Sequence, residues 1–419
     1  MRFHRLQRLS EDLSIGSLLF FWNSDAKRSH KTSINSRTRV GRTGPPRFAW
    51  VSVAPLLIVG LVSVSAATQE APPPCNLDSS QPRVVRTHHV MGTRMVTTIE
   101  AASRQAALAA SESVLEAVTH AERRLSTWTA SSELSRINAS PVGEPVLLSP
   151  MLGRDLEAAL QCAHETGGAF TPGIGGLVGA WKLREGGRRP TVEEIESAVA
   201  GASLENVRLE NDHITRLDQR FSFEEGAFGK GAGLDDALER LRSSAASAAV
   251  IDLGGQLAVW GRTTAWVDIA HPRDRGRPIL RLEVSRGSVA TSGSSERGMV
   301  IGGQRLGHVL DPRTGLPTGD FGSVTVWADD ATRADCLSTA LYVLGPDTAH
   351  TWASQQLDLG LVTVTYQGDR LLATATTNLR GRLVTLSDEV VLNWHGLNSD
   401  HGTSALWHVD QSHIPFENR

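Results

Sequence analysis

The spacing of apolar residues along the chain predicts several amphipathic helices. In five segments the apolar side chains recur every three or four positions, which places them on one face of a helix. These segments are residues 104–125, the stretch from Pro150 to Gly167, residues 190–201, the stretch from Leu234 to Leu241, and residues 333–345. The third segment opens with Thr191 and Glu194, which have the spacing of a capping box.

Alternating apolar and polar residues predict strands between these helices. Two alternating runs around Gly92 indicate a hairpin or a bulged strand over residues 84–100. Because helices and strands are mixed without a strict alternation, the pattern favours an α+β fold with largely antiparallel sheets. The polar C-terminal segment shows no clear periodicity from about residue 388, and we assign residues 377–419 to a tail. The further predicted strands are residues 248–253, 265–270, 279–284, 323–328, 361–366 and 370–376.

The N-terminal part of the chain differs from the rest in composition. Residues 1–47 hold ten Lys and Arg residues against three acidic residues, and residues 48–67 are almost wholly apolar and end in small side chains. This order is typical of a secretory signal. An uncleaved membrane anchor is the alternative, because the apolar run approaches the length that spans a bilayer. Residues 1–67 are therefore predicted to direct export, followed by a Pro-rich linker over residues 68–83.

Charge and cysteine content limit the classes of function. Residues 67–419 hold 32 Lys and Arg residues and 42 acidic residues, a net charge of about −10. This balance argues against a nucleic-acid-binding protein, and an anionic ligand would need local cations or a metal ion. Cys162 and Cys336 lie in this part of the chain, where an oxidising compartment would permit a disulfide without requiring one.

A glycine-rich segment and one predicted helix hold the main candidates for chemistry. In GAFGKGAG (226–233), Lys230 lies between glycines just before a predicted helix, an arrangement that suits a phosphate group. On the last predicted helix, Asp335 and Thr339 present hard oxygen atoms from successive turns, as Mg²⁺ prefers. A structural role is the alternative for Asp335, because Thr332 and Asp335 have the spacing of a capping box.

Other chemistries find less support in the sequence. The chain has no Gly-x-Ser-x-Gly elbow of a serine hydrolase, and it has neither His-Glu-x-x-His nor paired Cys-x-x-Cys for zinc. The glycine-rich segments lack the spacing of a P-loop. His308 and Cys336 could form a nucleophile pair, but the acidic residue before Cys336 disfavours a thiolate there.

Eight short motifs follow one another along residues 84–376. They are Met-Gly-Thr (91–93), LSTWTASSELSRIN (125–138), TGGAFTPGIGGLVGAW (166–181), GAFGKGAGLD (226–235), DLGG (252–255), ATSG (290–293), GHVLDPRTGLP (307–317) and ADCLSTAL (334–341). This order resembles the FAD:protein FMN transferases, the ApbE flavin-trafficking family. The resemblance implies a single bilobal domain of mixed, largely antiparallel sheets flanked by helices. It also fits export, because many members work in the periplasm or on the outer face of the cytoplasmic membrane.

Members of that family bind FAD and Mg²⁺, pass FMN to a Thr or Ser hydroxyl of an acceptor protein, and release AMP. The resemblance therefore implies FAD as substrate, Mg²⁺ as cofactor and a membrane or periplasmic redox protein as acceptor, and it allows a homodimer. By position it implies proton transfer by His308 and charge neutralisation by Lys230. The implied metal ligands are Ala227 (through its carbonyl), Asp335, Ser338 and Thr339. The implied FAD contacts are Met91, Trp128, Ala169, Phe170, Thr171, Glu224, Lys230 and Leu310.

Three positions depart from the pattern of that family. Thr171 stands where relatives usually have Asp, Glu224 stands where Asp is common, and Ser338 occupies a position that is often acidic. The site therefore holds fewer carboxylates than a typical member, which predicts weaker Mg²⁺ binding or altered flavin selectivity. Two alternatives stay open: a metal-dependent pyrophosphatase that releases FMN and AMP, and a non-catalytic flavin-binding protein of the periplasm.

Overall fold

The computed structural model describes residues 75–76, 81–294, 298–301 and 303–396. The predicted export segment, residues 48–67, lies outside these ranges. Within them, no helix has both the length and the apolar character needed to cross a membrane.

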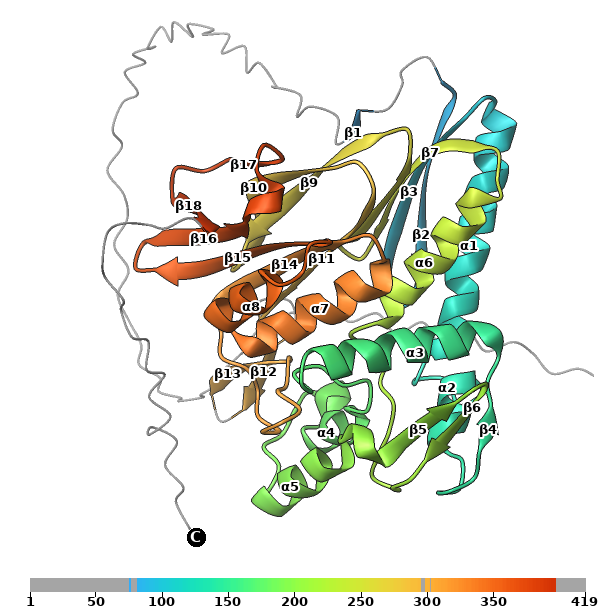
Figure 1. Ribbon diagram of the computed structural model, residues 1–419, viewed down its shortest axis with the longest axis vertical. Coiled ribbons are helices and arrows are strands. Elements are labelled where there is room, and N and C mark those ends of the chain that lie inside the picture. The colour runs from blue at the N-terminus through green and yellow to red at the C-terminus, as the bar shows by residue number, and fades with distance from the viewer. Residues whose placement is uncertain (1–74, 77–80, 295–297, 302, 397–419) are drawn as a thin grey trace, which may run out of the picture. The chain divides into compact units, whose positions relative to one another are not determined.

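A nine-stranded sheet forms the centre of the fold (Figure 1). All neighbouring strands pair antiparallel except β16 and β18, which run parallel. The predicted α+β fold with largely antiparallel sheets is confirmed. In spatial order the strands are β18 (Val390–His395), β16 (Arg370–Thr376), β15 (Leu359–Gln367), β14 (Gly322–Ala328), β11 (Gly287–Gly293), β8 (Gln256–Gly261), β7 (Ala246–Leu253), β3 (Thr93–Ala101) and β2 (Arg83–Val90).

A second sheet covers one face of the large sheet. Aliphatic side chains of its two long strands pack against β8, β11 and β14–β16 and exclude water from the space between the sheets. Its strands, in spatial order, are β1 (Cys75–Asn76), β9 (Thr264–His271), β10 (Asp274–Val284) and β17 (Leu383–Thr385).

Helices cover the opposite face (Figure 1). Helix α7 contacts β11, β14, α3, α6 and α8, so almost every side of it is buried. A helix that is enclosed in this way can hold a polar side chain only if that side chain has a partner. The helices of this layer are α1 (Arg104–Leu125), α6 (Gly229–Arg242), α7 (Ala331–Leu344) and α8 (Pro346–Ala353).

The chain between α1 and α6 builds a smaller lobe, in the lower half of Figure 1. Its helix α5 has the predicted capping box, with both reciprocal hydrogen bonds of Thr191 and Glu194. The elements of this lobe are α2 (Glu133–Asn138), β4 (Val146–Leu147), α3 (Pro150–Glu165), α4 (Gly175–Ala180), η1 (Leu183–Glu185), α5 (Val192–Gly201), η2 (Leu204–Asn206), β5 (Val207–Glu210) and β6 (His213–Arg216). A separate hairpin, β12 (Gly298–Ile301) and β13 (Gln304–Gly307), packs against it through Met299 and Leu306.

Helix α6 begins inside the glycine-rich segment rather than after Gly233, where the leucine spacing places its start. A Cβ atom at Gly231 would lie 2.5 Å from the Ala331 carbonyl oxygen. Glycine therefore lets α6 cross the start of α7 at close range. Lys230 lies in the first turn of the helix, not in a loop before it.

Residues 377–396 add structure where the sequence pattern indicates a tail. They include η3 (Thr377–Leu379), β17 and β18, and the buried side chains of Leu383 and Val390 join the core between the two sheets. The large sheet therefore extends past the predicted boundary at residue 376. β17 has only three residues, and the sequence VVLNWH of β18 does not alternate apolar and polar residues. Residues 397–419 lie outside the described ranges.

Candidate functional site

The first turn of α6 meets the second turn of α7 in a part-buried ion pair. Lys230 Nζ lies 2.9 Å and 3.2 Å from the two carboxylate oxygens of Asp335. The backbone N–H of Gly231 also donates to Asp335, at 3.1 Å. The Asp335 side chain is 6% exposed and the Lys230 side chain is 31% exposed. A buried carboxylate is thus paired with a cation that reaches solvent.

The capping-box interpretation of Asp335 is wrong. Helix α7 begins at Ala331, and the carboxylate that accepts its first N–H groups belongs to Asp235 of α6. Asp235 accepts the N–H groups of Ala331 and Thr332, each at 2.8 Å, and the Thr332 hydroxyl at 2.7 Å. Burial raises the pKa of Asp235, and these hydrogen bonds oppose that rise. Each helix therefore has a first-turn N–H group bonded to a carboxylate of the other helix.

Hydroxyl groups line the same face of α7 as Asp335. Ser338 Oγ donates to the Asp335 carbonyl at 2.9 Å and lies 2.9 Å from Ser292 Oγ. Ser292, on β11, is also 3.4 Å from Thr339 Oγ1. Ser338 is 1% exposed and its hydroxyl is already used twice, whereas Thr339 is only half-buried. Thr339 is therefore the better placed of the two as a metal ligand.

The donor set at this point fits a hard divalent cation. Within the described ranges, no three His, Cys, Asp or Glu side chains come together as they would around zinc. Asp335 and Thr339 instead offer a carboxylate and a hydroxyl, one helical turn apart. Ala227 lies half-buried in the loop that leads into α6, three residues before Lys230. Oxygen donors of this kind suit Mg²⁺, with water and a ligand phosphate completing the coordination.

Met91 lies over the first two turns of α6. It occupies a left-handed turn conformation (φ 53°) between β2 and β3, and its N–H group donates to Glu122 at 2.9 Å. A Cβ atom at Gly233 would lie 3.2 Å from Met91 Sδ, and one at Gly229 would lie 3.5 Å from Met91 Cε. The structure therefore brings Met91 to the helix turn that carries Lys230.

Trp128 and Glu224 meet through a residue that the motifs did not single out, Arg184 of η1. The Arg184 Cζ atom lies 4.3 Å from the centroid of the Trp128 ring. Its guanidinium donates to Glu224 Oε2 at 2.5 Å, to the Thr127 carbonyl at 3.2 Å and to the Thr127 hydroxyl. Thr127 in turn donates to Glu225, whose carbonyl accepts the Gly229 N–H group at 2.7 Å. This chain of contacts runs from the exposed indole to the start of α6.

The segment 169–171 lies beside Glu224 but points its side chains into the protein. Ala169 and Phe170 are buried in the core. The Thr171 hydroxyl donates to the Ala202 carbonyl at 3.2 Å and accepts the Gly173 N–H group at 3.1 Å. Thr171 can replace an acid here because its hydroxyl still closes the local turn. The segment remains next to the site because the Glu224 N–H group donates to the Pro172 carbonyl at 2.8 Å.

His308 directly follows β13. A Cβ atom at the preceding Gly307 would lie 2.8 Å from Ser294 Oγ, and that hydroxyl lies 2.6 Å from Tyr342 Oη of α7. Leu310 is buried in the small lobe in one cluster with Leu177. The residue before His308 therefore lies against Ser294, which bonds Tyr342 of α7, whereas the Leu310 side chain belongs to a core.

Cys162 and Cys336 are both buried free thiols. Burial, and next the neighbouring Cys162 thiol, raise the pKa of Cys336 well above its ordinary value. A thiolate nucleophile is therefore disfavoured at Cys336, as the acidic residue before it also indicates.

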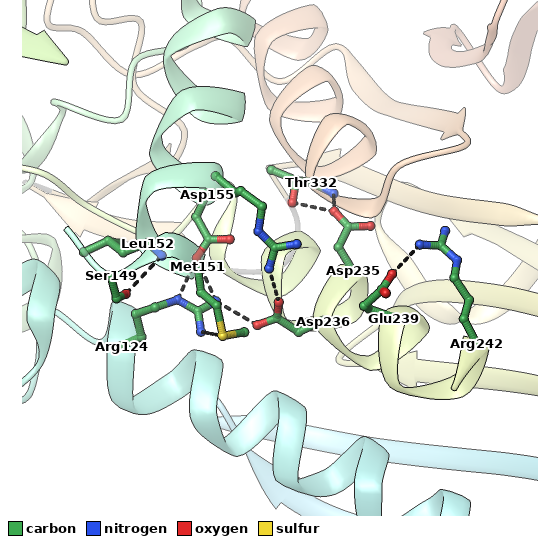
Figure 2. Close-up of polar contacts among 11 residues, drawn as sticks. Arg124, Ser149, Met151, Leu152, Asp155, Asp235, Asp236, Glu239, Arg242 and Thr332 are labelled. Atoms are coloured by element: carbon green, nitrogen blue, oxygen red, sulfur yellow. Dashed lines mark hydrogen bonds and ion pairs between the residues drawn. The ribbon is translucent and has the colours of Figure 1, made fainter. Parts of the chain in front are cut away.

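A cavity of about 620 Å³ lies between α3, α6 and α7, and none of the predicted site residues lines it. Figure 2 shows the polar contacts along its wall. Arg124 donates to Asp155 and to Asp236, each at 2.8 Å, and all three side chains are less than a tenth exposed. Burial raises the pKa of Asp155 to about 6, and the Arg124 charge only partly offsets that rise. We interpret this cluster as structural.

Known proteins resemble this chain over most of the described residues. The model of the ApbE family matches residues 91–362. The FAD:protein FMN transferase of Treponema pallidum (strain Nichols) is 33% identical over 259 residues, covering 57% of this chain and 72% of that protein. The FAD:protein FMN transferase of Escherichia coli (strain K12) is 27% identical over 261 residues, covering 59% and 74%.

Solved structures show the same fold. The flavin transferase ApbE from Vibrio cholerae matches with a TM-score of 0.63 at 21% identity, over 72% of this chain and 99% of that chain. The ApbE protein from Thermotoga maritima matches with a TM-score of 0.62 at 28% identity, over 68% of this chain and 94% of that chain. The first likeness shows the fold alone, because its identity is low.

Proposed function

Because the chain belongs to the ApbE family, we propose that it transfers FMN from FAD to a Thr or Ser hydroxyl of an acceptor protein, with Mg²⁺ as cofactor. Its relatives from Treponema pallidum and Escherichia coli carry the name FAD:protein FMN transferase. The observation that carries the proposal is the Lys230–Asp335 pair at the crossing of α6 and α7.

The reaction is a displacement at phosphorus. The acceptor hydroxyl oxygen forms a bond to the FMN phosphorus of FAD, the bond from that phosphorus to the bridging oxygen breaks, and AMP leaves. Both the pyrophosphate and the leaving group are anionic, so the site must supply positive charge. Mg²⁺ at Asp335 and Thr339 would supply the larger part of that charge.

Lys230 has the position and the freedom to supply the rest. In the structure its ammonium group bonds both Asp335 oxygens. A metal ion bound at Asp335 would replace the ammonium group as the counter-charge of this carboxylate. The Lys230 side chain reaches solvent and can turn toward a phosphate at the N-terminus of α6. The positive end of the α6 helix dipole lies at the same point and favours an anion there.

We assign proton transfer from the acceptor hydroxyl to His308. An imidazole has an intrinsic pKa near neutrality, which suits a general base for this step. The support is the family motif in which His308 occurs and its place directly after β13.

We also propose that residues 48–67 export the protein, so that it acts in the periplasm or on the outer face of the cytoplasmic membrane. The acceptor would then be a redox protein of the same compartment. Cell fractionation of the full-length chain, with and without residues 1–67, tests this; recovery of both forms in the cytoplasm would contradict it.

Mass spectrometry of a candidate acceptor tests the reaction. The protein is incubated with FAD, Mg²⁺ and the acceptor, and the acceptor should gain the mass of FMN on a Thr or Ser. Asp335→Ala and addition of EDTA should each abolish the gain. Release of free FMN and AMP without acceptor would favour the pyrophosphatase alternative. FAD that stays intact with Mg²⁺ and several acceptors would contradict the proposed function.

A further inference from the structure

Arg184 joins three segments that are distant in the sequence. It lies on η1 of the small lobe, Thr127 and Trp128 follow α1, and Glu224 precedes α6. One guanidinium contacts all three of these residues. Arginine suits this task because its planar fork bonds two acceptors while its flat face packs on an aromatic ring.

Trp128 is an exposed aromatic side chain with one face already occupied. Its relative exposure is 69%, which is high for a large aromatic residue. Arg184 lies over the ring at cation–π distance. The guanidinium holds the indole in one orientation, and the remaining exposed ring surface is open to a flat ligand.

Glu224 has the same guanidinium as its cationic partner. Its side chain is 15% exposed, and burial raises its pKa. The hydrogen bond from Arg184 is the first influence that opposes this rise. Without Arg184, a buried carboxylate would lose its cationic partner, which costs free energy or a proton.

The backbone around η1 fixes where Arg184 lies. Lys182 before it and Gly186 after it both have positive φ, of 50° and 95°. The Arg188 N–H group donates to the Trp181 carbonyl at 2.9 Å and closes the loop. A Cβ atom at Gly187 would lie 2.7 Å from Met299 Cγ, so the hairpin β12–β13 packs tightly on the loop. A left-handed lysine persists only where its surroundings impose it.

We propose that Arg184 is a positioning residue for FAD: it holds Trp128 and Glu224 in place so that the open face of the indole receives an aromatic ring of FAD. The inference rests on the proposed function, because it takes FAD as the ligand. It adds a residue that the family motifs do not contain. Arg184 acts through Trp128 and Glu224 and takes no part in the displacement at phosphorus.

FAD titrations followed by flavin fluorescence test the inference without any transfer. The full-length protein is titrated in EDTA and again in Mg²⁺. Arg184→Met should weaken FAD binding by about tenfold in both conditions. Arg184→Lys restores the charge but not the fork and should recover only part of the loss. Arg189→Met, an exposed arginine on the same loop, removes the same charge and should leave binding unchanged.

Two further measurements separate positioning from a general loss of structure. Arg184→Met and Glu224→Gln should be non-additive, with the double variant within about twofold of the weaker single variant. In the transfer assay Arg184→Met should raise the KM for FAD about tenfold while kcat at saturating FAD changes less than about threefold. Titrations with FMN and with AMP then show which ring of FAD loses affinity.

Specific results would overturn the inference. If Arg184→Met binds FAD within twofold of the wild-type protein, or loses affinity for neither FMN nor AMP, Arg184 does not position the ligand. The same holds if kcat falls while KM is unchanged. If Arg184→Met unfolds, Arg184→Lys decides alone, and wild-type affinity in that variant counts against the inference. A wild-type protein that binds FAD but transfers no FMN contradicts only the proposed function.

Discussion

Helix α6 carries two ionic clusters, one on each side of Asp235 in the sequence. They differ in whether the basic side chain can leave its carboxylate partner. In the first, Arg124 lies between Asp155 and Asp236 at 2.7–2.8 Å, and every side chain is 5–8% exposed. In the second, Lys230 lies 2.9 Å from Asp335, and the lysine is 31% exposed while the aspartate is 6% exposed. The first cluster joins α1, α3 and α6, and the second joins α6 to α7.

The difference shows how one helix can serve both the fold and the site. The Arg124 guanidinium is held by two buried acids and is itself only 5% exposed, so it is enclosed as part of the fold. An ammonium group on a flexible stem, with solvent on one side, can leave its carboxylate when a divalent cation arrives. Burial of the acid is common to both clusters; exposure of the base separates a structural contact from an exchangeable one.

Removing the enclosed cation should have the largest effect. Arg124→Met leaves Asp155 and Asp236 buried without their main counter-charge, and we expect a loss of about 3–5 kcal/mol in the free energy of unfolding, measured with urea. Arg154→Met is the matched control, because Arg154 is 62% exposed and lies 3.5 Å from Asp236. It should cost less than about 1 kcal/mol. Equal losses of unfolding free energy for Arg124→Met and Arg154→Met would contradict a structural role of the enclosed cluster.

Removing the exchangeable cation should instead change binding and rate. Lys230→Met takes a competitor away from Asp335, so Mn²⁺, titrated by electron paramagnetic resonance, should bind about tenfold more tightly. FMN transfer should fall on the order of 100-fold, because the phosphates lose a cation. Arg240→Met on the exposed part of α6 serves as the charge control. Weaker Mn²⁺ binding in Lys230→Met would show that Mn²⁺ and the Lys230 ammonium group do not compete for the Asp335 carboxylate.

The enclosed cluster should also give a pH signature. The pKa of Asp155 is raised in the fold to about 6, from an ordinary value of 3.8. Between these values the folded protein binds more protons than the unfolded chain, so the contribution of this group to stability falls as pH rises. From pH 4.5 to pH 7 we expect a loss of about 2 kcal/mol from this group.

Asp155→Asn cannot titrate and should lack that loss. Urea unfolding at both pH values should therefore show the variant gaining about 2 kcal/mol relative to the wild-type protein as pH rises. Taking the difference between the two proteins cancels the other carboxylates, which titrate in both. A difference that is constant with pH, or that changes in the opposite direction, would contradict the raised pKa.

The smallest effect lies between the clusters, at the start of α7. Asp235→Ala removes the acceptor of three hydrogen bonds and should cost about 1–2 kcal/mol of unfolding free energy. Asp330 is the residue at the N-cap position, yet its side chain makes no capping bond. Asp330→Ala should therefore cost less than about 0.5 kcal/mol. If urea unfolding shows a larger loss for Asp330→Ala than for Asp235→Ala, Asp330 rather than Asp235 caps α7.

The repeating patterns of the sequence predicted most of the elements and the family. Alternation located β7, β9, β10, β14, β15 and β16, and helical spacing located α1, α3 and α5. The order of the eight motifs predicted the ApbE family, which the family model confirms. The structure pairs Lys230 with Asp335, and the site and the roles of its individual residues stay predictions.

What the sequence could not show were contacts between segments far apart in the chain. Thr332 and Asp335 have the spacing of a capping box, but the Thr332 N–H group donates to Asp235, 97 positions earlier in the chain. Arg184 has no local signature, because its importance comes from Trp128 and Glu224, which only the fold brings to it. The edge strand β18 was not predicted because its sequence, VVLNWH, does not alternate, and only the fold brings it beside β16.

The exchange of carboxylates between α6 and α7 has a consequence for protein engineering. Asp335 bonds the Gly231 N–H group, and Asp235 bonds the first N–H groups of α7, so each motif completes the helix start of the other. The segments 226–235 and 331–341, the second of which includes the first turn of α7, therefore have to be transplanted together. A chimaera that receives only one of them inherits a helix whose first turn has lost its acceptor, and a graft of this site into another scaffold has to carry both helices and the angle at which they cross.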